Sequence, residues 1–285
     1  MSSEGIPSPA GDAIPERDDE APAWPDDHPA FDTSVAHQAR VYDYLLGGKD
    51  NYAADRAAGE AMIAAYPGTA YTARANRAFL GRVVRFLAGE AGIRQFLDIG
   101  TGIPAAGSTH EVAQEVAPDS RVVYVDYDPV VLAHARALLT VSPPGASDFI
   151  DADLRDTGTV LAKAARTLDF SRPVAVLLLA ILHAIGDDED PYPIVTQLMD
   201  AVPAGSYLAI SHIAVDIQPE QVGAAGDRLN QASYQQYTLR NRAQVARFFD
   251  GLEVAEPGLV QVQQWRPGIS TRKITPTWAG VARKR

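Results

Sequence analysis

The sequence predicts an α/β fold in which helices cover both faces of a mostly parallel sheet. From Arg94 onward, strand-like and helix-like segments alternate, which is typical of parallel strands joined by helical crossovers. The best of the strand-like segments are near-continuous apolar runs, as strands buried on both faces require. The chain has 285 residues, 46% of them hydrophobic, which is enough for one large core of this kind.

The pattern predicts five strands, over 95–99, 121–126, 147–151, 173–182 and 206–211. Three of the intervening helices have recognisable starts, which are the pair Ser108 and Glu111, then Asp128-Pro129, then Asp190-Pro191. A further helix is expected over 241–249. Two extended segments follow, and because no helix fits between them we expect an antiparallel hairpin over 259–264 and 277–283.

The first 92 residues divide into a tail and a helical region. Residues 1–30 contain eight Asp or Glu residues, six Pro residues and one basic residue, Arg17. This segment lacks the apolar surface that offsets the entropy of ordering, so we expect a disordered acidic tail over 1–31. Helical spacing and helix stops then predict three helices, over about 35–46, 53–66 and 69–87. We expect 32–92 to form a helical lid and 93–285 to form the main domain.

Composition excludes several classes of site. The chain has no Cys, so it has no disulfides, thiolate metal sites or cysteine nucleophiles, and its six His show no metal-ligand spacing with the acids, so no metal site is expected. The tail carries −7 of the net charge of −11, so the remainder is nearly balanced and shows no nucleic-acid footprint. No apolar run approaches the roughly 18 residues of a membrane span and no signal peptide opens the chain. We expect a cytoplasmic protein that binds neither membrane nor nucleic acid.

The most informative segment is Phe96–Gly102, read together with Val122–Asp126. An apolar strand runs into a glycine turn, a helix follows, and a second apolar strand ends on an acid. This order builds a nucleotide pocket at the carboxyl ends of parallel strands. Glycines let the backbone approach a ligand closely, and the terminal acid accepts hydrogen bonds from ribose hydroxyls.

Two nucleotides compete for this pocket. Gly100 to Ala105 satisfies the G-x-G-x-x-G/A pattern, which indicates an NAD(P)-dependent oxidoreductase. Three features favour S-adenosylmethionine instead. Asp98 precedes the turn, where an acid suits an amine better than a pyrophosphate. The turn is lengthened to Gly107, so the next helix begins too late to hold a pyrophosphate at its N-terminus. Finally, Asp153 closes the third strand, where a polar group can read the adenine amino edge.

At these residues the chain resembles class I S-adenosylmethionine-dependent methyltransferases, and in particular the DUF574-type S-adenosyl methyltransferases. The resemblance covers nearly all of the chain expected to be ordered and rests on four segments, Arg40–Tyr52, Asp98–Gly102, Thr109–Val112 and Val174–Ala180. It implies a Rossmann-like, seven-stranded sheet whose last strand is antiparallel, in agreement with the expected hairpin. It implies methyl transfer from S-adenosylmethionine without naming an acceptor.

The resemblance also implies a set of cofactor-binding residues, namely Asp98, Gly100, Thr101, Gly102, Asp126, Tyr127, Asp153, Leu154 and Ala180. Within this set Asp126 matches the ribose acid, Tyr127 is a wall for adenine, and Asp153-Leu154 match the adenine-reading position. Residues 180–183 follow the fourth strand, where family members present groups to the methyl donor and acceptor. They lack the Asn/Asp-Pro-Pro-Tyr/Phe tetrad of DNA amino-methylating enzymes, which argues against a DNA amine as acceptor.

The catalytic residues are less well indicated than the cofactor site, because an activated methyl group needs alignment more than it needs a base. His183 is the candidate catalytic residue. It and His212 follow neighbouring strands, and each is either a base or a buried structural histidine. Lys49–Asn51 form a solvated turn or, as the resemblance implies, have a role in a cofactor lid or in acceptor binding. Arg74 and Arg77 are expected on a solvated helix face.

We expect the acceptor to be a small or medium organic molecule held beneath the lid, where Tyr42, Tyr44 and Tyr52 supply aromatic groups. A peptide acceptor stays open, and the sequence does not indicate an oligomeric state. A protein that binds S-adenosylmethionine without catalysis is the second alternative, because its cofactor motifs would look the same.

Overall fold

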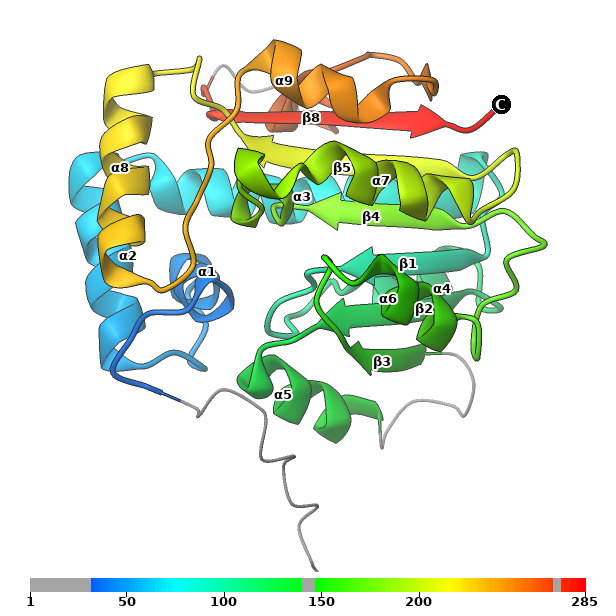
Figure 1. The fold of residues 1–285 in the computed structure, drawn as a ribbon, viewed down its shortest axis with the longest axis horizontal. Coiled ribbons are helices and arrows are strands. Elements are labelled where there is room, and N and C mark those ends of the chain that lie inside the picture. The colour runs from blue at the N-terminus through cyan, green and yellow to red at the C-terminus, as the bar shows by residue number, and fades with distance from the viewer. Residues whose placement is uncertain (1–31, 140–146, 269–272) are drawn as a thin grey trace, which may run out of the picture. The chain divides into compact units, whose positions relative to one another are not determined.

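A mostly parallel sheet forms the centre of the computed structural model (Figure 1), which describes residues 32–139, 147–268 and 273–285. The tail expected over 1–31 lies outside the described residues. The strands are β1 Gln95–Ile99, β2 Arg121–Asp126, β3 Ser147–Asp151, β4 Ala175–Leu179, β5 Tyr207–Ile213, β6 Glu253–Val254, β7 Val260–Gln261 and β8 Thr277–Arg283. They are ordered β3-β2-β1-β4-β5-β8-β6, and β7 also pairs with β8.

The C-terminal strands close the sheet as expected. β1 to β5 pair in parallel, whereas β8 runs antiparallel to β5, and β7 pairs antiparallel with β8. The predicted hairpin is therefore confirmed. The described sheet has eight strands instead of the implied seven, because two short segments, β6 and β7, both pair with β8.

The α-helices are α1 Gln38–Leu46, α2 Ala53–Ala65, α3 Thr69–Arg85, α4 Thr109–Val116, α5 Pro129–Leu139, α6 Thr157–Ala164, α7 Pro191–Asp200, α8 Pro219–Ala232 and α9 Arg242–Ala246. Two predicted starts are confirmed by hydrogen bonds. Glu111 accepts from the backbone N–H of Ser108 at 3.2 Å, and Asp128 accepts from that of Val130 at 2.6 Å. Asp190, in contrast, has a left-handed backbone (φ 47°) and makes no capping hydrogen bond, so α7 begins at Pro191 without a cap.

Successive strand residues bury against opposite faces of the sheet. Phe96 packs with Phe79 of α3 and Val112 of α4, whereas the next residue, Leu97, belongs to the core on the other face, which includes Leu198 of α7. Because both faces are covered, every residue of β1 and β4 is buried, which explains the continuous apolar character of β4.

Three helices, α1, α2 and α8, lie together beyond the carboxyl ends of the parallel strands (Figure 1), and we call them the roof. They share an apolar cluster that includes Val41, Leu45, Met62 and Leu229. The described residues belong to one compact unit, Asp32–Arg285, so the roof and the sheet are parts of a single body. This arrangement places the roof directly over the edge where the predicted site residues lie.

Candidate active site

A cavity of about 160 Å³ lies between the carboxyl ends of the strands and the roof. Most of the predicted site residues line it, namely Asp98, Gly100, Thr101, Gly102, Asp126, Tyr127, Ala180 and His183. Asp153 and Leu154 are not on this wall. Asp153 forms an ion pair with Arg155 at 3.2 Å, and the Leu154 side chain packs in the sheet core. Their role in reading adenine stays a prediction.

The glycine turn is shaped by a close approach to the segment after β4. Gly100 has φ 73°, and its N–H donates to the Val125 carbonyl at 2.8 Å. A Cβ atom at this position would lie 2.5 Å from the Ile181 side chain. Only glycine therefore permits the turn to pass this segment at the observed distance. Gly102 also has a left-handed φ, 66°.

Asp126 ends β2 and holds the turn in place. One carboxylate oxygen accepts from the N–H of Gly102 at 2.9 Å, and the other accepts from those of Tyr127 and Asp128 at 2.9 and 3.0 Å. Burial raises the pKa of Asp126, and these backbone donors oppose the rise. A carboxylate offers about four lone-pair positions, so capacity for a ligand hydroxyl remains.

Asp98 is buried at the end of β1, where it accepts a hydrogen bond from the Thr109 hydroxyl at 2.6 Å. Burial raises the pKa of Asp98 to about 6, and the Thr109 hydrogen bond and the nearby Arg77 guanidinium oppose this rise. A buried acid without a cationic partner in contact is costly to ionise. The site therefore favours a ligand that brings a positive charge to Asp98.

Arg77 is the charged residue that sequence reasoning placed wrongly. Instead of lying on a solvated face, it lines the cavity from α3 and donates to the carbonyls of Ala105 and Ala106 at 2.7 and 3.2 Å. Its Nε is buried without a hydrogen-bond partner among the described residues. Its spacing could have indicated this position. Arg77 lies four residues after buried Ala73 and three before buried Leu80, which places it on the same face of α3.

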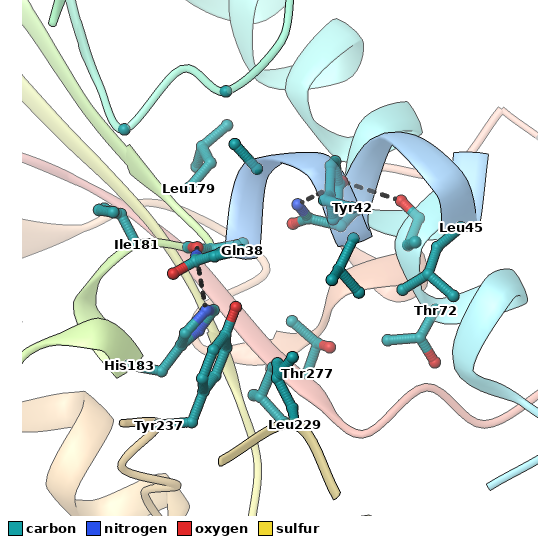
Figure 2. Close-up of a pocket in the computed structure, with 18 of the residues that line it drawn as sticks. Gln38, Tyr42, Leu45, Thr72, Leu179, Ile181, His183, Leu229, Tyr237 and Thr277 are labelled. Atoms are coloured by element: carbon teal, nitrogen blue, oxygen red, sulfur yellow. Dashed lines mark hydrogen bonds between the residues drawn. The ribbon is translucent and has the colours of Figure 1, made fainter. Parts of the chain in front are cut away.

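His183 is buried at the other side of the turn, where its ring stacks on Tyr237 with centroids 4.5 Å apart. Burial lowers the pKa of His183 well below its usual value, and the charge of the Arg240 guanidinium adds to this effect. His183 is therefore neutral near pH 7. Its Nε2 lies 3.1 Å from Nε2 of Gln38 (Figure 2). The same Gln38 nitrogen donates to the Ala180 carbonyl at 2.9 Å.

The contacts of Gln38 fix the proton on His183. The Ala180 carbonyl accepts from the amide nitrogen of Gln38, so the same nitrogen donates to His183 and leaves the imidazole proton on Nδ1. Ala180 itself has a left-handed φ of 57°, which is uncommon for a residue other than glycine and is typical of functional sites. Neither Gln38 nor this backbone strain was predicted, and no local sequence signal indicated them.

Both ring nitrogens of His212 contact other groups of the protein. Its Nδ1 lies 2.8 Å from the Ile213 carbonyl, and its Nε2 lies 3.0 Å from Nη1 of Arg240, so both ring nitrogens are occupied. Burial lowers the pKa of His212 to about 3. Arg240 is fully buried and also donates to the Leu182 carbonyl at 2.8 Å, which holds the segment that carries His183. Of the two readings, the geometry favours a buried structural histidine.

The turn at Lys49–Asn51 is not part of the cavity wall. Asp43 anchors it by accepting from the backbone of Asp50 at 3.0 Å and from the side chain of Asn51 at 2.8 Å.

In the described part of the chain, no group of three or more His, Cys, Asp or Glu side chains is placed to bind a metal ion. None of the described helices has both the length and the apolar character that a membrane crossing needs.

Comparison with known proteins identifies the family that this chain matches. A family model described as S-adenosyl methyltransferase matches residues 25–285. A DUF574 family protein from Streptomyces avermitilis MA-4680 is 46% identical, with a TM-score of 0.85 over 89% of this chain and 99% of that one. A Thermobifida fusca YX protein assigned as a methyltransferase is 40% identical, with a TM-score of 0.83 over 89% of this chain and 96% of that one.

More distant structures share the fold alone. The mitomycin 7-O-methyltransferase MmcR is 16% identical, with a TM-score of 0.50 over 86% of this chain and 68% of that one. No curated protein gives a significant match to the chain. The family match covers most of the sequence and agrees with the glycine turn and its two acids. The chain belongs to the S-adenosyl methyltransferase family and is an S-adenosylmethionine-dependent methyltransferase.

Proposed function

We propose that the glycine-turn end of the cavity binds S-adenosylmethionine and that the roof end binds a small organic methyl acceptor. The observation that carries this proposal is the charge pattern around the glycine turn, where two acids and one base line a single cavity: Asp98, Asp126 and Arg77. Residues with these charges fit the cofactor, whose amino acid end is a zwitterion and whose ribose presents two hydroxyl groups. Tyr127, on the same wall, supplies a ring face for adenine.

The amino acid end fits between Asp98 and Arg77. These opposite charges are near enough for Arg77 to affect the pKa of Asp98, but the Arg77 guanidinium donates to backbone carbonyls at 105 and 106. An ammonium group at Asp98 and a carboxylate at Arg77 would each complete a charge-assisted hydrogen bond. A pyrophosphate would instead meet two buried acids, so the charge pattern does not favour NAD(P).

The protein has to align the acceptor with the methyl group and to exclude water. When bound, the cofactor supplies a methyl group on a sulfonium ion, so that the carbon–sulfur electron pair returns to sulfur while the acceptor heteroatom forms the new bond to carbon. Gln38 fixes the segment at Ala180 through its hydrogen bond, and Ile181 packs against the glycine turn. These contacts hold the turn, the end of β4 and the first roof helix in one geometry.

His183 is proposed as the base, with one structural condition. Gln38 occupies the Nε2 lone pair, so proton acceptance at that atom requires the amide to move. A His183→Asn variant that binds S-adenosylhomocysteine normally but transfers no methyl group would support this role. Full transfer activity in the same variant would contradict it.

Two measurements test the proposed function. In an equilibrium titration of the full chain, we expect S-adenosylhomocysteine to bind and NADH not to bind, and binding of NADH alone would contradict the cofactor site. Transfer of a labelled methyl group from S-adenosylmethionine to a cell extract tests catalysis, with Asp126→Ala as the control. Cofactor binding without any transfer would favour the non-catalytic alternative.

A further inference from the structure

Resting on the cofactor site proposed above, we infer that the roof end of the cavity binds an uncharged ring compound that carries a hydroxyl group. We call this end the acceptor chamber, and we define it by six residues of its wall, Tyr42, Leu45, Met62, Ala225, Leu229 and Tyr237. They come from α1, α2, α8 and the segment that follows α8. The chamber is thus built by the roof and not by the sheet.

The acceptor chamber has no charged side chain on its wall that could pair with a charged acceptor. Within the described residues, the Asp, Glu, Lys and Arg side chains on the wall of the whole cavity are those of Asp98, Asp126 and Arg77, and all three surround the glycine turn. A phosphate, carboxylate or ammonium group in the chamber would lose its hydration without gaining a partner of opposite charge, which is strongly unfavourable. The acceptor is therefore neutral where it is buried.

One polar group of the chamber is already satisfied by the protein. The Tyr42 hydroxyl donates to the Ala73 carbonyl at 3.0 Å and accepts from the Asn76 amide at 3.0 Å. The Asn76 oxygen in turn accepts from the Ser211 hydroxyl at 2.6 Å. This closed network fixes α1 and α3 against β5, and it leaves Tyr42 to act mainly as an apolar ring toward a ligand.

Apart from Arg77 Nε at the glycine turn, three polar atoms on the cavity wall lack partners among the described residues. They are Oε1 of Gln38, Nδ1 of His183 and Oγ1 of Thr277, all buried. Buried polar atoms without partners are rare and call for a ligand or water. Gln38 Oε1 needs a donor, and His183 Nδ1 carries a proton and needs an acceptor. A hydroxyl group both donates and accepts, so it offers what each of these atoms lacks.

The shape and chemistry of the wall favour a flat apolar body for this hydroxyl. Figure 2 shows Tyr237 alongside His183 at one end of the chamber, with Leu45 and Thr72 at the other. The two stacked rings lie nearly parallel, at 19°. Aromatic and branched side chains of this kind bind rings through apolar burial and stacking.

The charge preference is testable on the unmodified full chain saturated with S-adenosylhomocysteine. Its affinity for 6-hydroxy-2-naphthamide and for 6-hydroxy-2-naphthoate is measured, because these probes share size and hydroxyl group and differ in charge. We expect the amide to bind about tenfold or more tightly than the carboxylate. Equal or tighter binding of the carboxylate would overturn the inference, as would failure of both probes while S-adenosylhomocysteine binds. Failure of S-adenosylhomocysteine itself would overturn the cofactor site instead.

Two neighbouring positions of α8 give a matched pair for locating the chamber. Ala225 is buried on the chamber wall, whereas Ala224 is exposed. Ala225→Phe should weaken naphthamide binding about tenfold or more while S-adenosylhomocysteine affinity changes less than about twofold. Ala224→Phe should leave both affinities unchanged. If Ala225→Phe does not fold, Leu229→Phe makes the same test more mildly. Unchanged naphthamide affinity in a folded chamber variant would overturn the inference.

Discussion

Asp126 supports the glycine turn by accepting three backbone N–H groups, and we propose that the same carboxylate binds ribose. Asp126→Ala should lower the affinity for S-adenosylhomocysteine about tenfold or more, since hydrogen bonds to a charged group contribute about 1.5–3 kcal/mol each. It should also lower the melting temperature of the ligand-free protein. Calorimetric titration and thermal unfolding measure the two effects.

The matched control is Asp200→Ala, which removes an exposed carboxylate at the end of α7 and changes the net charge equally. It should leave affinity and melting temperature nearly unchanged. Unaltered affinity in Asp126→Ala would show that Asp126 only supports the turn.

Arg77 is predicted to recognise the carboxylate of the cofactor's amino acid end. Arg77→Leu should weaken S-adenosylhomocysteine binding about tenfold, because a charge-assisted contact is lost. Binding of 5′-methylthioadenosine, which lacks the amino acid group, should not change. Arg74→Leu, at an exposed position of the same helix, is the control. Equal losses for both ligands would mean that Arg77 shapes the turn without contacting the amino acid.

Asp98 should make the stability of the ligand-free protein depend on pH. Burial raises the pKa of Asp98 to about 6, so the folded chain holds a proton that the unfolded chain releases near pH 4. The free energy of unfolding should therefore fall as pH rises between about 4 and 6. Asp98→Asn has no carboxyl group to titrate, so it lacks this pH-dependent loss. Its free energy of unfolding minus that of wild type should increase by about 1–3 kcal/mol from pH 4 to pH 6.

Chemical denaturation at a series of pH values measures this difference. The wild-type protein should also bind S-adenosylhomocysteine more tightly as pH rises through about 6, because an ionised Asp98 receives the ammonium group. A stability difference that does not vary with pH would contradict this role of Asp98.

At the scale of elements, α1 is the roof helix that contacts the ends of the strands. Next to its first residue, His37 contacts the Asp128 carboxylate at 2.5 Å, and Gln38 reaches the end of β4. Although burial raises it, the pKa of Asp128 stays below its ordinary value because of the hydrogen bond from His37. We therefore propose that α1, together with α2, acts as a lid over both ligands.

Truncation tests the lid. Removing residues 1–66 deletes α1 and α2 and exposes the apolar face of α8, so we expect weaker S-adenosylhomocysteine binding, loss of methyl transfer and a sheet that is folded but less stable. Removing residues 1–30 deletes none of the described elements and should change none of these properties. Full cofactor affinity in the longer truncation would show that these helices are an appendage.

Elements were predictable where their signals are local. The bounds expected for β1, β2 and β3 are those observed, because apolar runs and the residues that end them lie together in the sequence. The helix α8 was missed. It carries Val222, Ala225 and Leu229 at helical spacing, but Gly223 and Gly226 weaken its intrinsic propensity, and packing against α2 compensates for this.

At the scale of the whole molecule, the grouping of Asp98 and Asp126 at one edge was predictable from sequence, whereas the roof wall of the cavity was not. Topology alone brings Asp98 and Asp126 to one edge, since both end neighbouring parallel strands. Gln38 and Ala180, in contrast, are 142 residues apart, and their contact depends on how the roof packs over β4. No local sequence pattern predicts such a contact, so the acceptor chamber could be identified only in the structure.

The most direct test of the central claim, that one cavity holds the cofactor at the glycine turn and the acceptor under the roof, is a crystal structure of the full chain with S-adenosylhomocysteine. We predict ribose hydroxyls within hydrogen-bond distance of Asp126, the ammonium and carboxylate groups at Asp98 and Arg77, and the sulfur facing the acceptor chamber. A ligand whose amino acid end lies in the chamber, or whose ribose lies away from Asp126, would contradict the claim.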